Sequence, residues 1–198
     1  MFPEQLETER LVLERLCHDT VDVLEYYHLC SRHEDDIDEV TSHLTWDPHA
    51  TLMETKTFID GVEQRWTDAE RAEYLIRPKS GEEGAGEIAG ATGIGIDWDR
   101  RTGELGTWLR KPFWGRGYSG ERAAALLELA FDRLDLEVVS VGHLTGNEKS
   151  KRAIEKYVEA HGGQYDGILR NWVPMGDEVR DLHRYTITRE QYWDAVEG

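Results

Sequence analysis

Residues 114–121 have the types and spacing that could seat a phosphate-like anion. The segment reads Trp-Gly-Arg-Gly-Tyr-Ser-Gly-Glu, with glycines at 115, 117 and 120, and a segment of helical periodicity begins directly after it. Glycine permits backbone dihedrals and close approaches that other residues forbid. The start of a helix adds unpaired N–H groups and the positive end of the helix dipole. Together these features predict a site for phosphate or pyrophosphate.

Basic residues gather around this turn although the chain is strongly acidic, with a formal net charge of −17. Two groups flank the turn and the start of the predicted helix at 148–161: Arg110, Lys111, Arg116 and Arg122, then Lys149, Lys151 and Arg152. A polyanionic ligand held near two helix starts would explain this placement. Ordinary solvated charges on helix surfaces are the alternative, and it stays open.

The glycine spacing has competing interpretations. It matches a dinucleotide-binding fingerprint, which would make the chain a nicotinamide-dependent reductase. That fingerprint follows a buried strand, and an acidic residue ends the next strand. Here a loop with Pro112 precedes the turn, and Thr145-Gly146-Asn147 follows the next predicted strand. No Gly-Lys-Ser/Thr follows, which argues against a P-loop, and a tight turn before a core helix remains the simplest alternative.

Hydrophobic periodicity predicts the elements that must position this turn. Strands are expected at 6–16, 74–76, 87–98, 105–109 and 138–144, with two more within 167–188 that turn at 174–177. Helices are expected at 19–28, 51–66, 119–134 and 148–161, whereas 34–47 looks acidic and irregular. This order predicts an α/β (α+β) fold, a mixed sheet with helices on both faces, in a single domain of residues 1–198.

Composition excludes several classes of protein. Seven Trp and eight Tyr argue against disorder, and the absence of an extended basic face argues against nucleic-acid binding. No apolar stretch approaches membrane-spanning length, and no signal pattern opens the chain, so we expect a cytoplasmic protein without a membrane partner. Cys17 and Cys30 form no metal-type pair, so no metal is expected.

The surface charge predicts a dependence on salt. A strongly acidic surface repels itself unless salt screens it. We therefore expect a halophilic protein from a high-salt cytoplasm, and an ordinary acidic protein is the alternative.

Several segments together resemble the GNAT N-acetyltransferase superfamily. These are Gly103-Glu104-Leu105-Gly106-Thr107-Trp108-Leu109, Pro112, the turn at 114–121, and Asn147-x-x-Ser150. The opening Glu7-Thr8-Glu9-Arg10-Leu11-Val12-Leu13 is similar to the first strand of the branch that includes ribosomal-protein N-terminal acetyltransferases (RimJ/RimL-like). So is Trp46-Asp47-Pro48 before a helix with Thr57-Phe58-Ile59. The resemblance spans nearly the whole chain.

The resemblance implies a twisted, mostly antiparallel sheet whose two central parallel strands splay apart, here 87–97 and 105–109. Acetyl-CoA, the implied cosubstrate, would wedge into the gap, with its pyrophosphate on the N–H groups of 115–120. The implied cofactor-binding residues are Leu109, Trp114, Gly115, Arg116, Gly117, Tyr118, Ser119, Gly120 and Asn147. Asn147 would hold the pantetheine arm or cap the helix at 148–161.

The implied reaction is acetyl transfer to a primary amine, of a protein N-terminus or a small molecule, by direct attack in a ternary complex. Glu104 is the first candidate for the general base, with Glu87 and Asp97 as alternates. An outward-facing strand carboxylate is the alternative interpretation of Glu104. His143 lies in an apolar strand and is expected in the core.

The leaving-group side departs from the family. Many relatives use a tyrosine on the helix after the last core strand, and the matching residue here is Ile154. Tyr157 is expected in the core. Ser150 is therefore the candidate that hydrogen-bonds the thiolate, although a hydroxyl is a poor acid.

The acceptor is expected against the N-terminal helices and the tail hairpin. Trp46, Trp172 and the acidic stretch 34–47 could attract a cationic amine there, unless these acids belong to a salt-adapted surface. A non-catalytic acyl-CoA-binding or sensor domain is the rival function, and a homodimer is left open.

Overall fold

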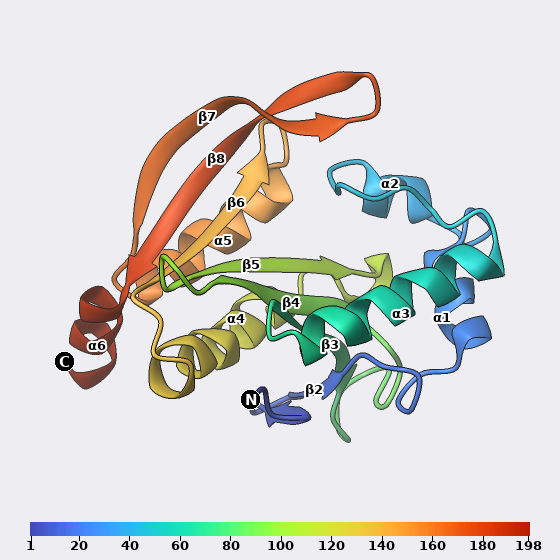
Figure 1. Cartoon of the computed structure of the whole chain (residues 1–198), viewed down its shortest axis with the longest axis horizontal. Helices are drawn as coiled ribbons and strands as arrows, with labels where there is room; N and C mark the ends of the chain where they lie inside the picture. Colours follow the sequence, from blue (N-terminus) through green and yellow to red (C-terminus); the bar gives the residue numbers. More distant parts are fainter.

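The computed structural model describes residues 1–198 and shows an eight-stranded sheet with helices on both faces (Figure 1). Its order is β1-β2-β3-β4-β5-β6-β8-β7, and every neighbouring pair is antiparallel except β5 and β6. The strands are β1 (Gln5–Glu7), β2 (Leu11–Arg15), β3 (Arg71–Pro78), β4 (Gly90–Asp97), β5 (Thr102–Leu109), β6 (Val138–Leu144), β7 (Gln164–Met175) and β8 (Glu178–Thr188). The α-helices are α1 (Val23–Cys30), α2 (Ile37–Thr41), α3 (Leu52–Thr67), α4 (Tyr118–Glu128), α5 (Glu148–Ala160) and α6 (Arg189–Glu197), with shorter turns η1 (Lys111–Phe113) and η2 (Leu129–Arg133). The predicted mixed α/β architecture is confirmed.

The two faces of the sheet carry different helices, and β3 shows how the sequence divides them. Successive side chains of a strand point to opposite faces. Tyr74 and Ile76 pack in the core that contains α4 and α5, whereas Leu75 packs in the core that contains α1 and α3. The sheet is therefore covered on both sides, which explains why β3 is apolar at consecutive positions.

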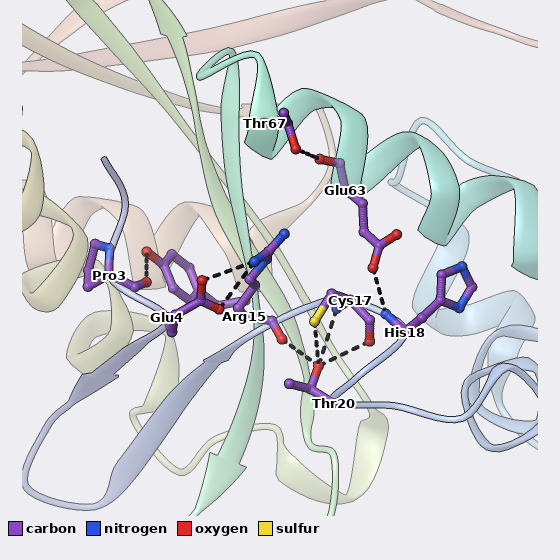
Figure 2. Close-up of polar contacts among 9 residues, drawn as sticks. Pro3, Glu4, Arg15, Cys17, His18, Thr20, Glu63 and Thr67 are labelled. Carbon is purple, nitrogen blue, oxygen red and sulfur yellow. Dashed lines mark hydrogen bonds and ion pairs between the residues drawn. The ribbon is translucent and has the colours of Figure 1, made fainter.

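Polar contacts at the end of β2 fix where α1 starts (Figure 2). The Thr20 hydroxyl donates to the carbonyl oxygen of Arg15 over 2.6 Å, and the His18 N–H donates to the Glu63 carboxylate of α3 over 2.9 Å. The buried Cys17 sulfur lies 3.5 Å from the same Thr20 hydroxyl. Asp22 then caps α1 by accepting from two N–H groups of its first turn. The sequence placed the helix cap at Asp19, three residues before the observed cap.

The prediction that 87–97 and 105–109 form the splayed parallel pair is wrong. β4 and β5 are consecutive strands joined by a short turn, and they pair antiparallel along their whole length, from Gly90↔Leu109 to Asp97↔Thr102. Parallel strands need a crossover connection, which a short turn cannot supply. The parallel pair is β5 with β6, which α4 connects.

β5 and β6 separate after three residue pairs. Their register runs from Thr102↔Val138 to Glu104↔Ser140 and then stops. β5 continues to Leu109 and β6 to Leu144 without further pairing between them. The splay that the family resemblance implied is therefore present, one strand further along the chain.

Other differences from the predicted elements are local. The predicted strand 6–16 is two strands, β1 and β2, because the Thr8 hydroxyl accepts from Leu11 N–H and closes a turn between them. The stretch expected to be irregular contains α2, and the tail continues into α6, whose first turn is closed by a Thr188–Gln191 capping box. None of the helices combines the length and hydropathy needed to span a membrane.

Candidate active site

The divergence of β5 and β6 opens a cavity of about 400 Å³. Its walls come from β5, β6, the first turns of α4 and α5, the segment before α3, and the β7 strand. The lining includes Glu104, Trp108, Ser119, Arg122, His143, Asn147, Ser150, Ile154, Tyr157, Trp46 and Trp172. Residues from both ends of the chain thus face one space, which is what a reaction between two substrates requires.

The glycine turn meets the geometric requirements of an anion seat. Gly115 and Gly117 have φ of +76° and +82°, a left-handed conformation that favours glycine. The N–H groups of residues 115–119 make no hydrogen bond within the protein, and Gly117 caps α4 without any side-chain acceptor. Five consecutive free donors at a helix start form a concave anion site.

Gly120 differs from the expectation. Its N–H already donates to the Gly117 carbonyl over 3.1 Å, so it is not a free donor. A Cβ at this position would lie 3.9 Å from Cβ of Tyr157, so the residue sits where α4 meets α5. That distance is an ordinary van der Waals contact, so the packing of α4 on α5 leaves room for a Cβ at this third glycine.

The segment between β1 and β2 holds the shape of the glycine turn. The Arg10 guanidinium donates to the Arg116 carbonyl over 2.9 Å and pairs with the Glu121 carboxylate over 2.7 Å. Glu121 also accepts from the Thr8 hydroxyl and the Arg10 N–H, and these donors keep its pKa below the ordinary value despite its partial burial. Long-range contacts therefore fix a loop whose own sequence is rich in glycine.

The side chains of the turn are less free than its backbone. Trp114 Nε1 donates to the Leu109 carbonyl over 2.7 Å, and Tyr118 is buried with its hydroxyl 2.7 Å from Glu82. Arg116 pairs with Glu83 over 3.0 Å. Only Ser119 of the turn itself lines the cavity. The predicted contacts of these residues with a cofactor thus rest mainly on their main chain.

Two of the basic residues around the turn, Lys111 and Lys149, already have acidic partners on α2 and the segment before it. Lys111 Nζ lies 2.7 Å from Asp36 and 2.8 Å from Glu39, and Lys149 Nζ lies 2.9 Å from Glu39. The two lysines together lower the pKa of Glu39 to about 2. Lys149 also lies 3.9 Å from the centre of the Trp114 ring. The acidic stretch 34–47 is therefore partly neutralised, which weakens its predicted role in attracting a cationic amine.

Arg122 was grouped with the basic residues of the turn, and that placement is wrong. Its side chain is 1% exposed and lines the cavity below α4 instead. Helical spacing explains the difference, because Arg122 is one turn past Tyr118 on the face that packs against the sheet.

Asn147 and Ser150 open α5 at the cavity wall. The Asn147 side chain accepts from the Ser150 N–H over 3.0 Å, which is the helix-cap geometry. Of the two roles expected for Asn147, the structure displays the cap. Ser150 is half-buried and faces the cavity, and the apolar Ile154 follows one turn later.

Glu104 is the only one of the three candidate bases that lines the cavity. It lies at the last residue pair before β5 and β6 separate, opposite Ser140. Asp97 pairs with Arg100 over 3.0 Å at the β4–β5 turn, and Glu87 lies 3.4 Å from Arg110 outside the lining. Geometry therefore separates three carboxylates that sequence alone left as alternatives.

The sequence analysis missed an ion pair on the floor of the cavity, Arg71 with Glu73, at 2.5 Å. A Cβ on Gly93 would lie 2.4 Å from Glu73 Oε2, and one on Gly106 would lie 3.0 Å from Arg71 Nη2. The signal available in the sequence was an Arg-x-Glu on one strand opposite strands with glycines at alternate positions.

His143 is buried as expected for a core residue. Its Nε2 lies 3.3 Å from the Tyr185 hydroxyl, and its ring stacks on His183 with centroids 4.7 Å apart. Burial lowers the pKa of His143, so the ring is neutral near pH 7.

Two of the predicted acceptor-side aromatics lie on opposite edges of the cavity. Trp46 packs edge-on against Trp108, with ring centroids 5.5 Å apart, whereas Trp172 is 59% exposed on β7. The β7–β8 hairpin extends toward α2, and Arg180 Nη1 donates to the Ser42 carbonyl over 3.5 Å (Figure 1). The predicted acceptor side is therefore bounded by parts of the chain that are 138 residues apart in sequence.

Known proteins are similar to this chain in sequence and in fold. The model of the acetyltransferase (GNAT) domain matches residues 10–157. The chain is 23% identical to the uncharacterized N-acetyltransferase p20 of Bacillus licheniformis over 190 residues, covering 96% of this chain and 98% of that protein. Its fold is similar to that of the microcin C7 self-immunity acetyltransferase MccE, solved with acetyl-CoA and AMP (TM-score 0.79, 18% identity, 94% and 97% coverage). It is also similar to RimL, a ribosomal L7/L12 alpha-N-protein acetyltransferase (TM-score 0.76, 18% identity, 93% and 94% coverage). With its splayed β5–β6 pair and its glycine turn at the start of α4, the chain belongs to the acetyltransferase (GNAT) domain family.

Proposed function

We propose that this protein is an acetyl-CoA-dependent N-acetyltransferase that transfers the acetyl group to a primary amine in a ternary complex. The observation that carries the proposal is the run of free N–H groups at residues 115–119, whose last residue, Ser119, lines the cavity between β5 and β6. These donors fit a pyrophosphate, and the cavity between the strands fits the pantetheine arm that ends in the reactive thioester.

The cofactor residues have different roles in this proposal. Gly115, Arg116, Gly117, Tyr118 and Ser119 bind the pyrophosphate through their main chain. Trp114 and Leu109 shape the approach to the turn. Gly120 follows directly after the last free N–H of the turn, and Asn147 caps α5 and positions its first turn beside the pantetheine arm.

Glu104 acts as the general base. An amine that arrives as an ammonium must lose a proton before its nitrogen can attack the thioester carbonyl. Glu104 lies where the strands separate and lines the cavity, so it can accept that proton directly or through one water. Ser150, on the opposite wall, donates a hydrogen bond to the sulfur as it leaves.

The acceptor is an amine of a protein N-terminus or of a small molecule. The likeness to RimL, together with the resemblance of segments 7–13 and 46–59, supports placement in the RimJ/RimL-like branch. The net charge of −17 supports a halophilic protein of a salt-rich cytoplasm. A melting temperature that rises with potassium chloride up to molar concentration is expected, and an unchanged melting temperature would contradict the halophilic assignment.

The proposed activity is tested with the purified chain in high salt. Acetyl-CoA should raise the melting temperature, and a panel of amines and N-terminal peptides should release the CoA thiol in the presence of acetyl-CoA. Binding without turnover on any acceptor would favour the rival acyl-CoA-binding or sensor domain. A thermal shift with a nicotinamide dinucleotide and none with acetyl-CoA would contradict both.

A further inference from the structure

Arg122 is a buried cation with no anionic partner. Its side chain is 1% exposed, lines the cavity, and forms no ion pair with any carboxylate. Nη1 donates to the Thr92 hydroxyl over 3.3 Å and Nη2 donates to the Tyr157 hydroxyl over 3.4 Å, both long contacts. Nε has no hydrogen-bond partner at all.

This absence of a partner is unusual within the same protein. Arg10, Arg110 and Arg116, the other arginines around the cofactor turn, each pair with a glutamate although each is more exposed. A buried guanidinium stays charged, and burial without an opposite charge is costly. An anion in the cavity would relieve this penalty.

The position of Arg122 restricts which anion this can be. A pyrophosphate on the free N–H groups of 115–119 lies at the surface turn, whereas Arg122 lies below α4 beside Tyr157 and Thr92. The proposed reaction itself creates a negative charge within the cavity, on the sulfur of CoA as this group leaves. The α5 residues Ser150, Ile154 and Tyr157 in the cavity wall carry no positive charge. The other arginine of the lining, Arg71, is already paired with Glu73.

We propose that Arg122 stabilises the CoA thiolate as the acetyl group leaves, an inference that rests on the proposed function. The amine lone pair forms the C–N bond, the thioester C–S bond breaks, and its electron pair stays on sulfur. Glu104 takes the ammonium proton before the attack and passes it to solvent. It then takes the second proton, which the nitrogen loses once the C–N bond has formed, and this proton also leaves to solvent. CoA leaves as a thiolate paired with the guanidinium, so no acid need protonate the sulfur during the transfer. Tyr157 and Thr92 position Arg122 for this contact.

The test uses CoA and desulfo-CoA, which lacks the thiol, as ligands for the whole chain. Calorimetry in two buffers of different ionisation enthalpy, between pH 6 and 9, measures affinity and proton release together. A thiol has an ordinary pKa near 8.5, and one unit of pKa shift corresponds to a tenfold change in affinity ratio. For the wild type we expect proton release with CoA alone, and a preference for CoA over desulfo-CoA that grows at least about tenfold toward pH 8. In R122M both effects should disappear while desulfo-CoA still binds.

Two further variants separate charge from structure. R122K keeps the positive charge and should retain part of the proton release. R116M removes an arginine at the turn and should weaken both ligands to the same extent without changing the pH dependence. Should R122M fail to fold, the wild-type comparison of the two ligands still tests whether CoA binds as a thiolate, and R122K tests whether this depends on Arg122.

The proposal is overturned if wild-type protein binds CoA and desulfo-CoA with the same pH dependence, or if R122M keeps the proton release. If the protein transfers acetyl groups but gives either of these results, the role of Arg122 is overturned and the proposed function stands. Failure to bind acetyl-CoA or CoA at all would instead overturn the proposed function.

Discussion

The two ends of the β5–β6 cavity are built in different ways. At the cofactor turn, five consecutive residues present main-chain N–H groups, and two glycines at positive φ give the loop its shape. On the acceptor side, Glu104, Glu73, Trp46 and Trp172 come from four separate segments and act through side chains. A site made of main-chain N–H groups is therefore determined by local sequence, whereas a site made of side chains depends on how distant segments fold together.

The same contrast explains which half can vary. A main-chain site tolerates changes in side chains as long as the glycine dihedrals survive, so it suits a cosubstrate shared across a family. The acceptor side can change its chemistry through single substitutions. Variants that damage one end of the cavity and spare the other test whether the two ends act independently.

The largest effect is expected for E104Q, which removes the proposed base at the vertex of the splay. A positioned base contributes about 10²–10⁴-fold, so kcat should fall about 10³-fold while the Kd for acetyl-CoA stays within twofold. Steady-state thiol release and calorimetry measure the two quantities. D97N is the matched control, because Asp97 pairs with Arg100 at the β4–β5 turn outside the cavity. Equal activity of E104Q and wild type would move the base elsewhere.

A loss of about 10²-fold in acetyl-CoA affinity is expected for G117V, with kcat at saturation changed much less. Valine is strained at a φ of +82°, and its Cβ would also lie 3.3 Å from Arg10 Nη2, so the N–H groups of the turn should lose their alignment. G167V places the same residue at another positive-φ glycine, in β7, with open space around the Cβ. It should lower the melting temperature and leave the Kd unchanged. Similar affinity losses in both variants would attribute the effect to instability alone.

An effect of about tenfold on the KM for the amine is expected for E73Q. The substitution leaves Arg71 unpaired on the floor of the acceptor side and should also cost about 1–2 kcal/mol of stability, given that Arg71 is 30% exposed. Acetyl-CoA affinity should not change. If E73Q leaves both the amine KM and the acetyl-CoA affinity unchanged, this ion pair is not part of the acceptor site.

The smallest effect concerns Glu39, which pairs with both Lys111 and Lys149. E39Q frees Lys149, while Lys111 keeps Asp36 as a partner, and should tighten acetyl-CoA binding about threefold at 50 mM salt, with no difference near 1 M, where the screening length is only about 3 Å. The pKa of Glu39 is lowered to about 2 from 4.5. Its ion pairs therefore contribute fully above pH 4.5 and are lost as the pH falls through about 2. Salt-independent tightening would contradict this competition.

Much of the fold could be predicted because its signals are local. Hydrophobic periodicity located α3, α5 and β6, and the glycine turn marked the start of α4 within one residue. The register of the sheet could not be read this way. The splay was wrongly assigned to 87–97 with 105–109. Strand pairing is set by connections and by contacts between distant strands, and no single segment encodes it.

The site shows the same limit. The free N–H groups of the turn follow from residues 115–119 themselves, whereas the Arg71–Glu73 pair depends on Gly93 and Gly106 in neighbouring strands. Arg122 was misplaced because a basic residue near a phosphate seat suggests a surface role, and only the packing of α4 on the sheet shows that it is buried.

The most direct test of the account is a crystal structure of the chain with acetyl-CoA in high salt. We expect the pyrophosphate oxygens within hydrogen-bond distance of the N–H groups of residues 115–119, and the thioester between β5 and β6, within reach of Glu104. Acetyl-CoA bound anywhere else, or a pyrophosphate that does not touch the turn, would contradict the assignment of this cavity as the site of acetyl transfer.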